Sequence, residues 1–342
     1  MVDAFNVLYR AFHALPHFTS PDGRPTNAVF GFARMVQALM DEIEPDYVAI
    51  ATDLPSEEPS FRQELIPEYK ANRPPMPEDL REQIPLLDRL AEALRLPMVG
   101  VAGYEADDVM GALAKLAEER GMDTYLATGD RDAYQLVSDH TFICASDRSL
   151  QSASILDAEG VREKLGVPPE RVIDLKALAG DPSDNIKGIQ GVGPKRALGL
   201  IEEFGTVEGV IENISRIPNQ RIREATEAAI DELRRAKEAV TIQRDIDLPV
   251  SLDSLARQPV DEELARALFL ELGLRSLMER YVSEREVKAE AVLLDPGDAD
   301  AIEATVAEMC NSGTVGVIAN VVDGRIAQLG LACSRSSGVA LS

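Results

Sequence analysis

Acidic residues gather in this sequence at points where a predicted strand ends and a helix begins. The nine are Asp3, Asp53, Glu105, Asp107, Asp108, Asp130, Asp132, Asp181 and Asp184. A single aspartate at such a point is typical of a helix N-cap, because its carboxylate accepts hydrogen bonds from free backbone N–H groups. One cap needs one carboxylate, yet the stretch YEADD supplies three within four residues. The set as a whole therefore indicates a role beyond capping.

Clustered carboxylates predict a site for hard divalent cations, which relieve the repulsion between the acids. Oxygen ligands select Mg²⁺ or Mn²⁺ over zinc. Two such ions about 4 Å apart can activate a water molecule and stabilise the leaving oxygen of a phosphodiester. The three histidines, His13, His17 and His140, lie outside the acidic motifs, and we expect them to be structural or exposed.

A glycine-rich turn at 186–196, IKGIQGVGPKR, has the features of a phosphate-binding hairpin. Gly191 and Gly193 leave backbone N–H groups exposed, Pro194 suits the first helical position, and Lys195 adds a cation. The same pattern is also typical of a turn between two helices that binds no ligand. Its place shortly after Asp184 favours phosphate binding.

Basic residues occur in a Pro-rich segment from Phe61 to Arg81 that shows no clear helical period. One interpretation is a solvated loop, because acids are interspersed with the bases. The length of the segment indicates a functional or mobile loop. We expect Tyr69 to stack on a base, and Lys70 and Arg73 to bind phosphate oxygens.

The elements that must position these residues alternate between helix and strand over residues 1–167. The patterns predict helices at 27–41, 78–94 and 106–120, with Asn27 as a cap, and strands at 47–51, 98–101 and 124–127. Strands separated by helices of this length predict an α/β fold with a mostly parallel sheet flanked by helices. Ligands bind such sheets at the carboxyl ends of the strands, where the acids stand.

The rest of the chain changes character twice. Residues 168–284 have an almost wholly helical pattern, which predicts an all-helical subdomain. A polar linker at 285–300 precedes a third unit at 301–342, which is too short for a core of its own. For that unit we expect a helix at 301–310 and strands at 314–322 and 325–332.

Composition and charge limit the class of protein. The 342 residues carry 59 acidic and 35 basic side chains, a net charge of −24, and 45% are hydrophobic. These values exclude intrinsic disorder, and three cysteines without a CxxC spacing argue against disulfides and thiolate zinc. No apolar stretch is long enough to span a bilayer, so we expect a cytoplasmic protein with no membrane partner. The charge alone argues against nucleic acid, but a few placed cations and metals suffice to hold phosphate.

Five blocks, in this order, resemble the 5′ nuclease domains of bacterial DNA polymerase I, which are members of the flap endonuclease family. They are VDAFNVLYRAFHALP, FRQELIPEYKANRPPMPEDLREQI, YEADDVMGALA, ATGDRDAYQL and GDPSDNIKGIQGVGPKRA, within residues 2–285. The resemblance implies a PIN/5′ nuclease-like core with a helix-hairpin-helix subdomain. It also implies a monomer that hydrolyses DNA from a 5′ end or at a 5′ flap, with nicked or primer-bearing duplex as partner, in primer removal and repair.

The resemblance also implies roles for individual residues. It assigns Asp3, Asp53, Glu105 and Asp107 to a first metal region, with Asp108 adjoining, and Asp130, Asp132, Asp181 and Asp184 to a second. It matches Arg10, Lys70 and Arg73, with Tyr69 beside them, to positions that contact the scissile region; Lys70 and Arg73 lie in a clamp segment at 54–82. The hairpin at Gly191, Gly193 and Lys195 would hold the duplex backbone, with a K⁺ ion.

Three departures from the family pattern lead to further expectations. Only Met1 and Val2 precede Asp3, so we expect a shortened central strand. Residues 314–341 resemble the start of a 3′ exonuclease domain, but the stretch Val315–Asn320 carries no carboxylate, which predicts no proofreading. The chain ends before any polymerase domain, so we expect no DNA synthesis and a tail with exposed strand edges.

Two alternatives stay open at this point. A shortened first strand would disable the first metal region while the hairpin still grips DNA, which would leave a non-catalytic junction-binding fragment. Metal-dependent cleavage separates the two hypotheses. An RNA-cleaving PIN-type toxin shares the acidic sheet edge but lacks both the GVGPK hairpin and the long clamp segment.

Overall fold

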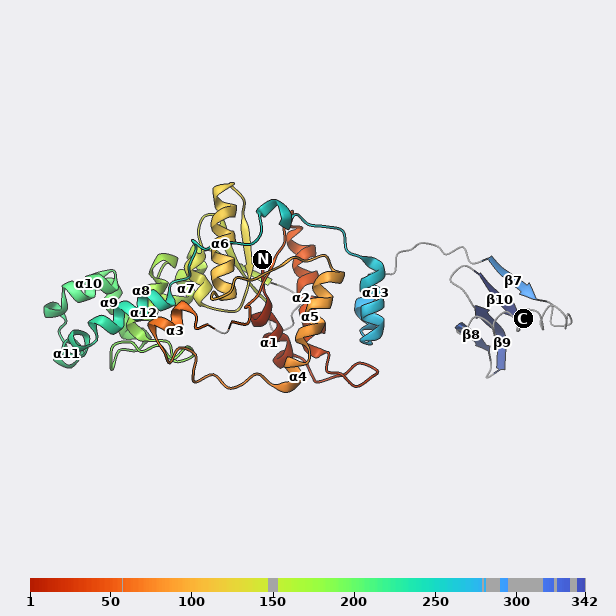
Figure 1. Ribbon diagram of the computed structural model, residues 1–342, viewed down its shortest axis with the longest axis horizontal. Helices are drawn as coiled ribbons and strands as arrows, with labels where there is room; N and C mark the ends of the chain where they lie inside the picture. The colour runs from red at the N-terminus through yellow and green to blue at the C-terminus, as the bar shows by residue number, and fades with distance from the viewer. Residues whose placement is uncertain are drawn as a thin grey trace. The chain divides into compact units, whose positions relative to one another are not determined.

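The computed structural model describes residues 1–56, 58–146, 153–278 and 280, together with four strands that follow residue 289. Contacts divide the chain into two units, Met1–Tyr281 and Val282–Ser342. The first unit contains a sheet flanked by helices, followed by a part built from helices (Figure 1). Within the described residues, none of the helices has the length and apolar character needed to cross a membrane.

The sheet of the first unit has six strands in the order β3-β2-β1-β4-β5-β6. Strands β1 to β5 run parallel and β6 runs antiparallel to β5, which confirms the mostly parallel sheet. The local patterns did not predict β5 and β6. The bounds are β1 Val2–Asp3, β2 Ile50–Ala51, β3 Met98–Val99, β4 Thr124–Ala127, β5 Thr141–Ser146 and β6 Ala153–Leu156.

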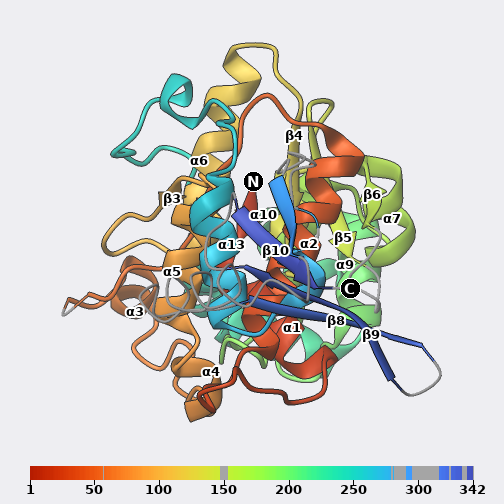
Figure 2. The ribbon, with the colours of Figure 1, turned by 90° about the vertical axis from the view of Figure 1, so that its right-hand side faces the viewer.

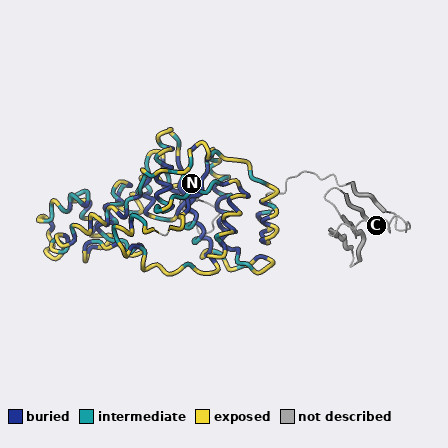
Figure 3. The backbone as a smooth tube through the Cα atoms, viewed as in Figure 1, coloured by how far each residue is buried: buried dark blue, intermediate teal, exposed yellow. Residues whose placement is uncertain are grey.

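Alternation along the strands divides the core between the two faces of the sheet. Ile50 faces one buried cluster, while Ala49 and Ala51 face the other. The first cluster is covered by α1 (Ala4–Ala14), α2 (Asn27–Ile43), α5 (Ile84–Ala93) and α13 (Glu262–Glu271), and the second by α6 (Ala106–Glu119). Figure 2 shows α13 beside α5, and Figure 3 marks the buried residues of these elements in dark blue.

Two helix predictions need correction, and both corrections involve Gln83. The predicted helix at 78–94 is divided into α4 (Glu78–Arg81) and α5. Between them the Gln83 side chain accepts hydrogen bonds from the backbone N–H groups of Ala28 (2.8 Å) and Val29 (3.2 Å). Gln83 therefore satisfies the start of α2, whereas Asn27 is the first residue of that helix and donates to the Phe12 carbonyl instead.

The expected helical pattern after residue 168 is confirmed. The helices there are α8 (Val172–Ala179), α9 (Pro194–Phe204), α10 (Val207–Glu212), α11 (Gln220–Ala228), α12 (Ile230–Val240), α13 and α14 (Arg275–Met278), and α7 (Ala158–Leu165) precedes them. Short 3-10 turns lie at Asp132–Leu136, Pro169–Arg171, Ile214–Arg216 and Leu252–Leu255. The clamp segment, for which no helix was expected before residue 78, contains α3 (Phe61–Leu65).

The second unit contains a four-stranded sheet in the order β7-β10-β9-β8. Its strands are β7 (Glu290–Leu294), β8 (Gly316–Val322), β9 (Arg325–Ala332) and β10 (Ser337–Leu341). The two strands predicted here are confirmed as β8 and β9, which pair with each other. The prediction of a linker at 285–300 is wrong for residues 290–294, because β7 lies there and pairs with β10. The predicted helix at 301–310 lies outside the described residues.

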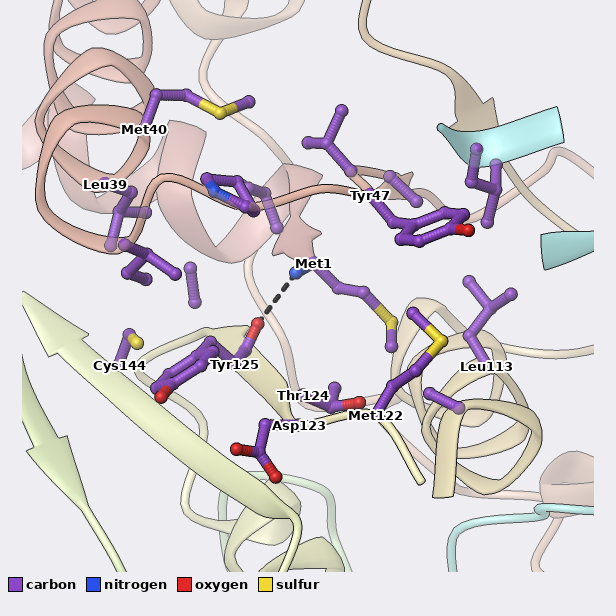
Figure 4. Close-up of a pocket in the computed structure, with 18 of the residues that line it drawn as sticks. Met1, Leu39, Met40, Tyr47, Leu113, Met122, Asp123, Thr124, Tyr125 and Cys144 are labelled. Carbon is purple, nitrogen blue, oxygen red and sulfur yellow. Dashed lines mark hydrogen bonds between the residues drawn. The ribbon is translucent and has the colours of Figure 1, made fainter. Parts of the chain in front are cut away.

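The centre of the first sheet contains an apolar cavity beside Met1 (Figure 4). Strand β1 has two residues and its neighbour β4 has four. Because the strands are parallel and Val2 pairs with Ala127, β1 begins too late to fill the space beside Thr124 and Tyr125. The cavity measures about 100 Å³. Within it the Met1 ammonium donates a hydrogen bond to the Tyr125 carbonyl at 2.7 Å. Burial lowers the pKa of this amine from 8.0 to about 6.

We expect this amine to make folding stability depend on pH. An amine with a lowered pKa binds its proton more weakly in the folded chain, so stability rises between pH 6 and pH 8. The shift of about two pKa units corresponds to about 2–3 kcal/mol. Urea unfolding of the free and N-acetylated chains at both pH values measures it. Between pH 6 and pH 8 the free energy of unfolding should increase more for the free chain than for the acetylated chain. An equal increase for both chains would contradict the expectation.

Candidate metal centre

The first group of acids lies at the carboxyl ends of β1 and β2 and at the start of α6. Asp3 ends β1 and caps α1, accepting hydrogen bonds from the Asn6 N–H (3.1 Å) and the Thr128 hydroxyl (2.9 Å). Asp53 follows β2 and accepts from the Ala106 N–H at 2.7 Å. Burial, with smaller contributions from the charges of Asp53 and Asp130, raises the pKa of Asp3 to about 6.

These acids share one cleft of about 630 Å³ with two basic side chains. Its lining includes Asp3, Asp53, Glu105, Asp107, Asp130, Lys70 and Arg73. The cleft therefore joins side chains that stand far apart in the sequence. That convergence follows from the parallel sheet, in which strand ends lie side by side at one edge.

A second group of acids adjoins the first through Asp130. Asp130 Oδ1 accepts the Asp132 N–H at 2.9 Å. Ligand oxygens of Asp132, Asp181 and Asp184 all lie within 4.8 Å of one another. The Lys176 ammonium, from the last turn of α8, contacts Asp132 and lies 2.8 Å from Asp181. Lys176 offsets part of the charge of this group, and sequence analysis did not single it out.

Asp108 is the exception among the predicted metal ligands. Its side chain is fully buried. Its two oxygens accept hydrogen bonds from Arg62, at 2.6 and 2.8 Å, and from the N–H groups of Glu105 (3.0 Å) and Gln243 (2.8 Å). Four donors leave this carboxylate no free direction toward an ion. The structure therefore contradicts direct metal ligation by Asp108.

The clamp segment brings its cations to the acids. Lys70 Nζ lies 2.7 Å from both carboxylate oxygens of Glu105. Arg73 lies 2.5 Å from Asp184 with half of its side chain exposed. The Lys70 backbone has a φ of +56°, and its N–H donates to the Asp184 carbonyl at 2.9 Å. Arg10, on α1, lies beside Gly129, and a Cβ added to Gly129 would be 3.5 Å from its guanidinium.

The structure contradicts base stacking by Tyr69. The residue is only 6% exposed. Its hydroxyl lies 3.2 Å from Glu105 and 3.3 Å from Asp184. Burial and the neighbouring carboxylates raise its pKa, so the phenol keeps its proton and donates it to these acids. Tyr69 therefore contacts one acid of each group, Glu105 and Asp184, and does not present an exposed ring to a ligand.

The glycine-rich hairpin lies on the surface ahead of α9. Gly191, Gly193 and Lys195 are exposed, and Gly193 precedes the helix with no side chain capping its N–H groups. Gly191 has a φ of +83°, a conformation that L side chains rarely adopt. Gly188 fixes the base of the turn, because an added Cβ would lie 2.3 Å from the Gly180 nitrogen.

The donor set of the cleft fits hard divalent cations. Oδ1 of Asp107 is buried and accepts no hydrogen bond within the described part of the chain; Arg62 lies 3.7 Å from this atom. Burial raises the pKa of Asp107 well above its ordinary value. A buried carboxylate oxygen without a donor, among other carboxylates, is a ligand suited to Mg²⁺ or Mn²⁺.

We expect bound Mg²⁺ to restore the stability that the folded chain loses as Asp3 gives up its proton. A carboxyl with a raised pKa holds its proton more tightly when folded, so in EDTA the shift of Asp3 removes about 3 kcal/mol between pH 4 and pH 6. Mg²⁺ competes with that proton. It should therefore raise the melting temperature at pH 7.5 and hardly change it at pH 5. Calorimetry at matched ionic strength tests this, and equal shifts at both pH values would contradict it.

Family models match most of the first unit. Residues 1–166 match the 5′-3′ exonuclease N-terminal resolvase-like domain, and residues 167–263 match the 5′-3′ exonuclease C-terminal SAM fold. The chain therefore belongs to the 5′-3′ exonuclease family. Among curated relatives, DNA polymerase I of Bacillus caldotenax is 40% identical over 283 residues, 83% of this chain and 32% of the relative. DNA polymerase I of Bacillus subtilis is 36% identical over 290 residues, 85% of this chain and 33% of the relative.

The chain thus spans about a third of the length of these curated relatives. Two solved structures support the fold. The T5 D15 protein co-crystallised with metal ions has a TM-score of 0.57 at 22% identity and covers 82% of this chain and 95% of its own. The catalytic core of Rad2 in complex with DNA substrate has a TM-score of 0.51 at 16% identity and covers 82% and 91%.

Proposed function

We propose that this chain hydrolyses DNA phosphodiesters as a 5′→3′ exonuclease and 5′ flap endonuclease. The observation that carries the proposal is the single cleft in which five acids meet Lys70 and Arg73. Family membership and the metal-bound and DNA-bound structural neighbours support it. The non-catalytic alternative is not favoured, because Asp3 lies in the cleft although β1 is short.

The acidic and basic side chains of the two adjoining groups have different roles in this chemistry. We assign Asp3, Asp53, Glu105 and Asp107 to one divalent ion, Mg²⁺ or Mn²⁺, and Asp130, Asp132, Asp181 and Asp184 to a second. Bound ions would lower the pKa of a water molecule and stabilise the leaving oxygen. Lys70 and Arg73, from one side of the cleft, orient the scissile phosphate through charge-assisted hydrogen bonds. Arg10, beside Gly129, is a third cation for the DNA strand that contains the scissile phosphate.

The hairpin provides a second grip on the substrate. The exposed N–H groups at the start of α9 and the Lys195 ammonium bind phosphates of the duplex next to the cleft. Carbonyl oxygens of the turn suit a K⁺ ion shared with a phosphate. The partner is DNA with a 5′ flap, nick or primer, bound by a monomer in the cytoplasm.

We expect Lys195→Ala to weaken binding without changing specificity for the junction. A lost phosphate contact reduces the slope of log affinity against log salt by about one. Fluorescence anisotropy of a flap duplex in EDTA, between 50 and 200 mM KCl, measures both affinity and slope. Lys164→Ala on α7, also an exposed lysine, is the matched control. An unchanged slope for Lys195→Ala would contradict a phosphate contact.

For the tail we propose the start of a 3′ exonuclease-like domain, which begins before residue 301 because β7 already pairs with β10. The β8 segment contains no carboxylate, so we expect no proofreading. Degradation from the 3′ end that survives loss of Asp107 and Asp130 would contradict this.

Cleavage of a 5′-labelled flap duplex tests the proposed function. The chain is compared with the Asp107→Ala, Asp130→Ala double variant, in Mg²⁺ and in EDTA. We expect cutting near the flap junction that needs Mg²⁺ and disappears in the double variant. Binding of the junction without any cutting would overturn the proposal and favour a non-catalytic, junction-binding protein.

A further inference from the structure

Arg62 is a buried cation at the base of the clamp segment. It belongs to α3 and is only 2% exposed, among the largest fully buried side chains within the described residues. Its guanidinium donates to both oxygens of Asp108, at 2.6 and 2.8 Å, and its Nε donates to the Ala239 carbonyl at 2.9 Å. One side chain therefore joins the clamp, the start of α6 and the end of α12.

Asp108 extends this junction in two directions. One oxygen accepts the Glu105 N–H, which closes a capping box at the start of α6. The other accepts the Gln243 N–H, on the segment that leaves the helical part. The backbone that carries Glu105 and Asp107 is therefore held by the carboxylate that Arg62 orients.

Arg62 also lies directly behind two acids of the cleft. Its Nη1 is 3.6 Å from Glu105 and its Nη2 is 3.7 Å from Asp107. These distances are too long for hydrogen bonds and short enough for electrostatic attraction. The charge is fixed in place by the bidentate pair with Asp108 and by Ala239, so it pulls the two carboxylates toward one defined position.

We infer that Arg62 is a positioning residue, which sets the clamp cations Lys70 and Arg73 against the metal-binding carboxylates. The inference deepens the proposed function and rests on it. Four residues separate the end of α3 from Lys70, and the turn between them is closed by the Tyr69 N–H bond to the Ile66 carbonyl at 2.8 Å. A shift of α3 relative to α6 would therefore move Lys70 relative to Glu105.

A purely structural role is the competing explanation, and it makes a different prediction. A buried ion pair can often be replaced by apolar residues of similar volume without loss of stability, whereas removal of one partner is strongly destabilising. The double variant Arg62→Met, Asp108→Leu should therefore fold. It lacks the fixed charge behind Glu105 and Asp107 and the capping box, while every residue assigned to an ion or to phosphate remains.

The test measures Mn²⁺ affinity without DNA, by calorimetry, and then kcat and KM for the flap duplex. In the double variant we expect Mn²⁺ affinity and kcat each to fall about 10–100-fold, as outer contacts of metal ligands do, with little change in KM. Arg62→Lys keeps the positive charge but not the paired hydrogen bonds to Asp108, so it should show an intermediate loss of Mn²⁺ affinity and kcat. This variant also provides the test if the double variant does not fold. Arg244→Met, which removes the 2.7 Å pair with Glu118 outside the cleft, is the control.

Unchanged Mn²⁺ affinity and kcat in a folded double variant, or in Arg62→Lys, would overturn the positioning role, even if the melting temperature fell. Failure of the proposed function is distinguishable, since the unaltered chain would then bind Mn²⁺ without cutting DNA. The metal-affinity comparison decides the role of Arg62 in that case as well.

Discussion

Replacement of Asp107 by alanine is expected to reduce flap cleavage about 10³-fold. A bound divalent ion contributes several kcal/mol of charge stabilisation, and each 1.36 kcal/mol corresponds to a tenfold change in rate. Asp107 supplies a buried oxygen that accepts no other hydrogen bond in the described part of the chain, so its loss removes a ligand directly. Single-turnover cleavage of a 5′-labelled flap at saturating enzyme measures the rate.

The same variant should not lose stability in EDTA. Burial raises the pKa of Asp107, which means that the ionised carboxylate destabilises the folded chain in the absence of metal. Alanine removes this destabilisation. The matched control is Asp88→Ala, an exposed aspartate on α5, which should leave both rate and melting temperature unchanged. A cleavage rate within tenfold of the original for Asp107→Ala would show that the residue holds no essential ion.

Lys70→Met is expected to give the second largest effect, a fall of about 10²–10³-fold in kcat. Removal of one positioned donor to a developing charge typically has an effect of this size. Methionine keeps the length of the side chain, so the loss reports the ammonium that lies 2.7 Å from Glu105. Single-turnover rates at several Mg²⁺ concentrations measure it.

Mg²⁺ affinity separates two roles for Lys70. If the ammonium acts on the phosphate, extra Mg²⁺ does not restore the rate of Lys70→Met. Full rescue by Mg²⁺ would instead show that Lys70 only orients Glu105. Lys164→Met on α7 controls for loss of an exposed positive charge and should cut at the original rate.

The convergence of the acids at one edge of the sheet was largely predictable from sequence, because each acid belongs to a local motif. Each acid stands at a strand end or helix start, and a parallel sheet places those points along one edge. Eight of the nine predicted ligands lie in the two adjoining groups, and Lys70 and Arg73 lie beside them. Strand β4 has the predicted bounds because its pattern is short, apolar and clearly bounded.

Contacts between distant segments were not predictable. Asp108 resembles its neighbour Asp107 in sequence, yet its partner Arg62 lies 46 residues away. Tyr69 stands among bases in an apparent loop, and only the approach of Asp184, 115 residues later, makes it a buried donor. The division of α4 from α5 depends on Gln83 reaching α2, 55 residues earlier. Periodicity and propensity contain no information on such pairs.

Two divalent ions are expected to bind, one at each of the two adjoining groups of acids. Diffraction from crystals grown with Mn²⁺, recorded at the manganese absorption edge, locates them. We predict two anomalous peaks, one against Asp107 with Asp3, Asp53 or Glu105, and one among Asp132, Asp181 and Asp184. The absence of any peak at either group of acids at saturating Mn²⁺, or peaks only at other acids, would contradict two-ion binding.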